Sequence, residues 1–214
     1  TAAPRGQLHR GVREEKLELL RALEPGGLAV LPVGLPADLP PGVRMVRFGS
    51  AGDVIWKAGP WDDQRRTGTI DGHRCRLRLA GRHDVGNAAA AYAVLREFGI
   101  CAKEAIEAME SVVPEDMRLT PRQCGRAVVW NDAYNANPES IRAAMVAFAD
   151  LVEPAKPKVL VLGEVLELGH WSEHAHQELG ESIAHSHAVD PFHEIFLVGD
   201  AFSLAAERLQ AHGF

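Results

Sequence analysis

A strand-like run followed by a helix-like stretch occurs three times after Leu119, and this repetition constrains the fold more than any other feature. The apolar runs predict strands near residues 127–131, 158–163 and 195–199. Strands that alternate with helices form parallel sheets, because each helix carries the chain back to the edge where the preceding strand began. The sequence therefore predicts an α/β fold with a Rossmann-like parallel sheet in its C-terminal part.

The first half of the chain predicts a mixed arrangement of helices and short strands. Pro32 and Pro41 delimit a Pro- and Gly-rich loop between two expected strands, and Gly99 is a suitable end for an Ala-rich helix. Short alternating runs between residues 53 and 82 predict an antiparallel pair of strands. The other expected elements are helices over 9–23, 85–98 and 103–112 and strands over 27–33 and 43–48.

Composition excludes several classes of protein. The 214 residues carry a formal net charge of -6, which argues against a nucleic-acid-binding surface, since that needs a clustered basic face. No apolar run approaches the length of a membrane span. Cys75, Cys101 and Cys124 are widely spaced and odd in number. We therefore interpret them as reduced thiols of a cytoplasmic protein, and not as a disulfide framework or a zinc site.

Polar residues cluster in the segment Asn131–Ser140, directly after the first strand of the repeated pattern. Open α/β folds bind ligands at the carboxyl ends of their strands, so Asp132, Tyr134 and the neighbouring asparagines are candidate ligand-binding residues. A structural interpretation is also open, because Asn137 at the N-cap and Pro138 at the first helical position would begin a helix.

Four segments of the chain resemble, in the same order, signatures of the Mur ligase family. Asp132–Ser140 resembles the Asp-x-Tyr-Asn-Ala-Asn-Pro-x-Ser strand end of the family's MurF group. Lys158–Gly169 resembles a strand followed by Gly-Asp-Met-x-Glu-Leu-Gly, and His176 falls where the family has a histidine. Gly81–Ala91 resembles Gly-x-His-Asn-x-x-Asn-Ala-Leu-Ala-Ala. Gly11–Lys16 resembles the segment whose lysine these ligases carbamoylate.

The resemblance implies a chain with two parts and a ligase activity. Residues 1–116 would be the C-terminal part of the family's mixed α/β central ATP-binding domain, and residues 117–214 a shortened C-terminal Rossmann-like domain. The expected protein is a cytoplasmic, monomeric enzyme of peptidoglycan precursor synthesis that uses ATP and Mg²⁺. It would add D-Ala-D-Ala to UDP-N-acetylmuramoyl-tripeptide through an acyl phosphate, whether the third residue of the tripeptide is lysine or diaminopimelate.

The resemblance also assigns roles to individual residues. Lys16, once carbamoylated, is expected to be a catalytic residue and a Mg²⁺ ligand, because the modification turns a repelling ammonium into a carboxylate-like ligand. His176 is expected to be catalytic as well. The residues expected to bind the nucleotide are His83, Asp84, Asn87, Arg118 and Asp132. The residues expected to bind the peptide substrates are Tyr134, Asn135, Asn137, Glu164 and Glu167.

Structural explanations remain open for several of these residues. Lys16 is equally explained as a solvated helix lysine beside Glu14 and Glu15, and Arg118 as a linker arginine in a surface ion pair. Asp84 would serve as the N-cap of the following helix. Asp84 also stands where the family has asparagine, and an ionised carboxylate accepts hydrogen bonds without donating any. Glu164 stands where the family has aspartate.

The histidines that follow the Lys158–Gly169 signature invite a metal interpretation that their spacing disfavours. His174 and His176 are two positions apart, so on a helix they point to different faces and do not share a zinc ion with His170.

No Gly-rich loop ending in Gly-Lys-Ser or Gly-Lys-Thr occurs in the 214 residues. By the resemblance, the chain is a fragment that lacks the N-terminal domain, this P-loop and the extreme C-terminus, and alone it is not expected to turn over ATP. The alternative is a non-catalytic Mur-like module that binds a ligand or a partner without ATPase activity.

Overall fold

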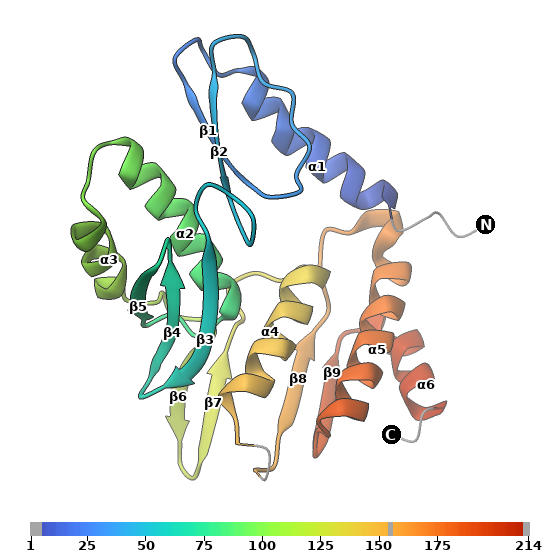
Figure 1. Cartoon of the computed structure of the whole chain (residues 1–214). Helices are drawn as coiled ribbons and strands as arrows, with labels where there is room; N and C mark the ends of the chain where they lie inside the picture. Colours follow the sequence, from blue (N-terminus) through green and yellow to red (C-terminus); the bar gives the residue numbers. More distant parts are fainter. Residues whose placement is uncertain (1–5, 154–155, 212–214) are drawn as a thin grey trace. The chain divides into compact units, whose positions relative to one another are not determined.

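The computed structural model describes residues 6–153 and 156–211, which form two compact units (Figure 1). Among these residues, the first unit comprises 6–78 and 82–112, and the second comprises 79–81 and 113–211. Helices accompany parallel and antiparallel strands, which confirms the predicted α/β class. Over the same described ranges, every helix is too short or too polar to cross a membrane.

The first unit opens with a helix and a parallel pair of strands. Helix α1 (Gly6–Arg21) precedes β1 (Leu28–Pro32), which pairs in parallel with β2 (Arg44–Phe48). The Pro-rich segment between these strands is a loop, as its composition predicts.

The predicted antiparallel pair over residues 53–82 is in fact a meander of three strands. These strands are β3 (Trp56–Asp62), β4 (Arg65–Ile70) and β5 (His73–Leu77), with β4 in the centre. Asp63 and Gln64 in the first turn, and Asp71 and Gly72 in the second, all have positive φ. Two consecutive left-handed residues match the right-handed twist of a hairpin, and Asp-Gly is the dipeptide that most favours such a turn.

Helices α2 (Arg82–Glu97) and α3 (Ala102–Ser111) complete the first unit and pack on the meander. Helix α2 approaches β3 closely, because a Cβ at Gly86 would lie 2.9 Å from a ring atom of Trp56. Gly99 ends α2 with φ of +79°, and the amide of Ile100 donates to the carbonyl of Leu95 over 3.1 Å. This is the Schellman end that a glycine after a helix predicts.

Cys75 on β5 provides a test of the first unit's core. Burial raises the pKa of its thiol to about 11, and the Glu110 carboxylate adds to the effect. A thiol reagent at pH 8 should therefore label the exposed Cys101 and Cys124 in the native protein and leave Cys75 unlabelled, as peptide mass spectrometry can measure. The free energy of unfolding should also fall as the pH rises from about 8.5, where an unfolded thiol ionises while the folded one stays protonated. Labelling of all three cysteines at one rate would contradict this packing.

The second unit begins with an antiparallel hairpin and continues with two strand–helix repeats. Strand β6 (Thr120–Cys124) pairs with β7 (Ala127–Asn131), and α4 (Pro138–Leu151) follows. Strand β8 (Val159–Gly163), a short 3-10 turn η1 (Gly169–Trp171) and α5 (Ser172–Val189) come next. The last described elements are β9 (Glu194–Val198), η2 (Asp200–Phe202) and α6 (Ser203–Ala211). The expected parallel pairing is found between β8 and β9, whereas β7 takes the unpredicted β6 as its partner.

One side of the β8–β9 pair faces the core of the second unit. Leu160, Leu162, Ile195 and Leu197 point to a cluster built from α4, α5, η2 and α6. The cluster contains the buried side chains Ile141, Met145, Val165, Leu179, Ile183, Phe202, Ala205 and Leu209. Val159, Val161, Phe196 and Val198 on the other side are also apolar but exposed, as expected for strands of a parallel sheet that carry apolar residues on both faces.

The crossing of α5 and α6 depends on a glycine. A Cβ at Gly180 would lie 2.9 Å from the Cβ of Ala205, a distance that packed side chains do not reach. The two helices therefore approach each other at two of the smallest residues, and Ala205 is fully buried there.

Candidate functional site

The polar segment after β7 organises its own backbone. The carboxamide oxygen of Asn137 accepts from the amide of Ser140 over 2.9 Å, and the Ser140 hydroxyl accepts from the amide of Asn137 over 3.0 Å. This reciprocal capping box begins α4, so the structural interpretation of Asn137 is confirmed. Asn131 and Asn135 accept from the amides of Ala133 and Ala136.

The capping box gives a direct prediction. Replacing Asn137 by alanine should lower the free energy of unfolding by about 1 kcal/mol, because the amide of Ser140 loses its acceptor. Asn137→Ser keeps an acceptor of similar reach, so its free energy of unfolding should stay close to that of the parent protein. Urea unfolding of both variants measures this difference. Equal losses of unfolding free energy in the alanine and serine variants would argue against the cap.

Arg118 and Tyr134 lie in contact at this strand end. The Arg118 guanidinium carbon lies 4.0 Å from the centroid of the Tyr134 ring, and the amide of Tyr134 donates to the carbonyl of Met117 over 3.1 Å. Met117 and Leu119 both have positive φ, which is a costly conformation for residues with a Cβ. The structure thus brings together one residue expected at the nucleotide and one expected at the peptide. Asp132 lies exposed between them in sequence.

Glu164 follows β8 and reaches the turn that follows β9. Its amide donates to the carbonyl of Val198 over 2.9 Å, and its carboxylate accepts from the amide of Ala201 over 3.2 Å. A carboxylate at these first amides is favourable because they lack partners within their own helical turn. Gly199, with φ of +116°, leaves room for this side chain, since a Cβ there would meet the Glu164 Cδ at 2.5 Å. Sequence reasoning missed Gly199, although a glycine directly after a strand is a turn signal.

Glu167 and His176 lie in contrasting surroundings near this second strand end. Glu167 is exposed and has φ of +62°. His176 is fully buried, and both of its ring nitrogens have partners in Val165 and Ser172. A buried imidazole with both nitrogens engaged is poorly suited to exchange a proton with a substrate, so the expected catalytic role of His176 gains no support from its position.

The remaining candidates belong to the first unit. His83 and Asp84 form a pair with 3.5 Å between Nε2 and Oδ1, and Asn87 is exposed one turn further along α2. Because α2 already begins at Arg82, Asp84 lies within the first turn, and the expectation that it is the N-cap is wrong.

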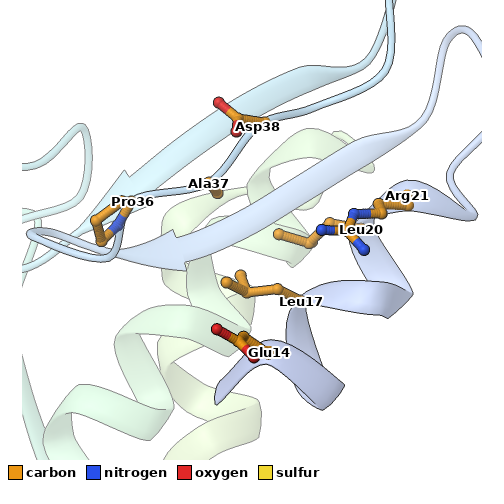
Figure 2. A pocket seen from close by; sticks show the side chains of 7 residues that line it. All are labelled: Glu14, Leu17, Leu20, Arg21, Pro36, Ala37 and Asp38. Atoms are coloured by element: carbon orange, nitrogen blue, oxygen red, sulfur yellow. The ribbon is translucent and has the colours of Figure 1, made fainter. Parts of the chain in front are cut away.

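Lys16 is exposed on α1, next to a pocket that the sequence did not predict. This pocket of about 380 Å³ lies between α1 and the Pro-rich loop (Figure 2). Lys16 itself is not among its lining residues, which are Glu14, Leu17, Leu20, Arg21, Pro36, Ala37 and Asp38.

Metal ligands are not grouped in the described part of the chain. Within residues 6–153 and 156–211, no three His, Cys, Asp or Glu side chains are arranged to hold a metal ion. His174 instead approaches Glu178, with 3.5 Å between Nε2 and Oε1. An unmodified Lys16 is a cation, so these residues do not form a Mg²⁺ site by themselves.

Comparison with known proteins identifies the second unit. Residues 117–212 match the family described as Mur ligase, glutamate ligase domain.

Curated relatives extend the similarity beyond that domain. The UDP-N-acetylmuramoyl-tripeptide–D-alanyl-D-alanine ligase of Mycobacterium tuberculosis H37Rv is 34% identical over 188 residues, covering 79% of this chain and 36% of that protein. The ligase of the same name from Bacillus subtilis 168 is 34% identical over 138 residues, covering 64% of this chain and 29% of that protein. The chain thus spans about a third of the length of the curated relatives it matches.

Solved structures agree with these relatives. A crystal structure of MurF from Acinetobacter baumannii superposes with a TM-score of 0.79 at 29% identity, covering 92% of this chain and 44% of that one. The MurF ligase of Thermotoga maritima in complex with ADP gives a TM-score of 0.72 over 95% of this chain and 56% of that one. Its identity of 20% shows a shared fold alone. Residues 117–212 therefore belong to the Mur ligase family as its glutamate ligase domain, and MurF ligases are among the relatives of this chain in both sequence and structure.

Proposed function

We propose that this chain is part of an ATP-dependent ligase that adds D-Ala-D-Ala to UDP-N-acetylmuramoyl-tripeptide. The observation that carries the proposal is its 34% identity over 188 residues to the Mycobacterium tuberculosis ligase of that name. This similarity covers more of the chain than either unit contains. The substrates are those in the relative's name, and ATP is proposed from the family resemblance.

The proposed reaction has two balanced steps. A carboxylate oxygen of the tripeptide attacks the γ-phosphorus of ATP, ADP leaves, and an acyl phosphate forms. The amine of D-Ala-D-Ala then attacks the acyl carbon, inorganic phosphate leaves, and the amine loses a proton. Chemistry of this kind depends on positioning and on charge stabilisation, because both steps require two anionic or polar reactants to be held in line.

The residues expected to bind the nucleotide and the peptides each have a proposed part in these steps. Arg118 and Asp132 would act at the phosphates and ribose, and His83, Asp84 and Asn87 at the adenine. Tyr134, Asn135, Asn137, Glu164 and Glu167 would surround the peptide substrates. The support for these five peptide-binding assignments is that all five residues follow the carboxyl ends of β7 and β8, where α/β folds bind ligands. Asn135 and Asn137 are exposed but accept from backbone amides, whereas Tyr134 and Glu167 are exposed members with side chains suited to a peptide.

Several family properties also enter as proposals. We divide the chain into residues 1–116 of a central ATP-binding domain and residues 117–214 of a C-terminal domain, and we expect a cytoplasmic monomer. Carbamoylation of Lys16, which would make it a Mg²⁺ ligand, is testable by carbon-13 nuclear magnetic resonance of the native protein in labelled bicarbonate, with Lys16→Arg as the control.

A coupled phosphate assay tests the function. The natural protein in full, supplied with ATP, UDP-N-acetylmuramoyl-tripeptide and D-Ala-D-Ala, should release phosphate only when all three are present. Residues 1–214 alone should release none, since they contain no Gly-Lys-Ser or Gly-Lys-Thr loop to hold the triphosphate. If the full protein released no phosphate with all three substrates present, the proposed ligase function would be refuted.

The alternative function is a Mur-like module that binds a ligand or partner without hydrolysing ATP. Calorimetry separates the two. Binding of the tripeptide nucleotide by the full protein without any ATP turnover would support the module.

A further inference from the structure

His176 lies at the centre of the contacts that hold both strand-end turns of the second unit. It belongs to the second turn of α5 and is completely buried. The amide of Val165 donates to its Nε2 over 3.0 Å, and its Nδ1 lies 2.7 Å from the carbonyl oxygen of Ser172. Its ring meets the Phe202 ring edge-on, with centroids 4.8 Å apart and an interplanar angle of 88°.

These partners define the protonation state of the ring. A carbonyl oxygen accepts only, so Nδ1 carries the hydrogen that is donated to Ser172. An amide N–H donates only, so Nε2 offers a lone pair to Val165. The ring is therefore a neutral Nδ1–H tautomer, and either the other tautomer or an imidazolium would lose the bond to Val165.

The two turns that His176 contacts are also bound to each other. Val165 follows Glu164, whose carboxylate accepts from Ala201 in η2, the turn that carries Phe202. One imidazole therefore contacts the turn after β8 through a hydrogen bond and the turn after β9 through the Phe202 ring. The exposed Glu167, with its left-handed backbone, lies in the loop that this hydrogen bond anchors.

We propose that His176 is a positioning residue, which holds the Glu164–Leu168 loop in the shape that binds the incoming dipeptide. This rests on the proposed ligase function, in which Glu164 and Glu167 of this loop surround the peptide substrates, one of which is D-Ala-D-Ala. His176 acts through Val165 and does not touch the substrate. Its loss should weaken dipeptide binding and leave ATP binding unchanged.

Two substitutions separate its two hydrogen bonds. In His176→Gln, the amide oxygen reaches the place of Nε2 and keeps the bond to Val165. In His176→Asn, the shorter amide keeps only the bond near Ser172. His174→Gln is the matched control, because His174 lies two positions away with 41% of its side chain exposed.

In the full natural protein, His176→Asn should raise the KM for D-Ala-D-Ala about tenfold, as expected for an orphaned buried amide. Its KM for ATP should not change. Both KM values of His176→Gln should stay within about threefold of those of the parent. The KM values of His174→Gln should match those of the parent. Equal effects of the glutamine and asparagine variants, or parallel changes in both KM values, would overturn the proposal.

Nuclear magnetic resonance tests the positioning claim without any activity. Long-range proton–nitrogen spectra should show the Nδ1–H tautomer, and the Val165 amide should exchange slowly in the parent and His176→Gln but about tenfold faster in His176→Asn. The Nε2–H tautomer, or unchanged exchange in His176→Asn, would refute the proposal. If these spectra agree but the full protein releases no phosphate, the ligase function fails and the positioning role of the ring stands.

Discussion

Replacing Arg118 by alanine should lower kcat/KM for ATP about a hundredfold in the full natural protein, the usual cost of losing one charged group that stabilises a phosphoryl transfer. A guanidinium presents paired donors that match phosphate oxygens, and it also stacks on aromatic rings. The ring of Tyr134 lies under Arg118 at 4.0 Å, so the side chain is held in place before a nucleotide arrives.

Arg118→Lys should recover little of the lost activity, because an ammonium keeps the charge but not the planar fork or the stacking. Tyr134→Phe retains the ring and should therefore keep most of the activity. The matched control is Arg122→Ala, since Arg122 forms an exposed ion pair with Asp116 at 2.8 Å in the same unit. Steady-state kinetics with ATP varied give the answer. If Arg118→Ala and Arg122→Ala lower kcat/KM for ATP equally, Arg118 has no specific role in binding the nucleotide.

Asp190→Ala should lower the free energy of unfolding by about 3 kcal/mol, the largest stability effect we expect from one polar substitution. Its partner Lys158 directly precedes β8 with 2% of its side chain exposed, and the ammonium pairs with the Asp190 carboxylate. Removing the carboxylate leaves a buried cation without its counter-charge. The carbonyl of Lys158 also accepts from the amide of His193, so the substitution acts at the end where both strands of the β8–β9 pair begin.

Urea unfolding with two control variants isolates this effect. Glu153→Ala removes an exposed ion pair with Lys156 and should cost about 0.5 kcal/mol or less. The double variant Lys158→Met with Asp190→Ala should regain most of the loss, because an apolar side chain fits a buried position without a partner. A loss from Asp190→Ala no greater than that from Glu153→Ala would mean that the pair does not stabilise the fold.

Local chemistry made much of the fold predictable. The end of α2 follows from Gly99, and the start of α4 from Asn137 and Pro138, because each of these residues has a strong positional preference. The dipeptide Asp71-Gly72 carried the signal for the third strand of the meander and was overlooked. Strand β6 carried no such signal, since Thr120–Cys124 contains a proline and mostly polar residues.

The candidate site was predictable in its members but less so in their contacts. Helical spacing places His176 on the same face as the buried Leu179 and Ile183, which could have revealed its burial. The contact of Arg118 with Tyr134 was beyond sequence reasoning. It depends on left-handed backbone at Met117 and Leu119, and non-glycine residues adopt that conformation only when surrounding structure imposes it.

The close crossing of α5 and α6 makes the site vulnerable to changes that never touch a ligand. A methyl group added at position 180 must push Ala205 away, and α6 continues directly from the turn that holds Phe202 and Ala201. That turn is the one bound by Glu164. Screens for inactivating substitutions should therefore recover position 180 together with the strand-end residues. Gly180 supports the position of their turn through α6, although it contacts no ligand itself.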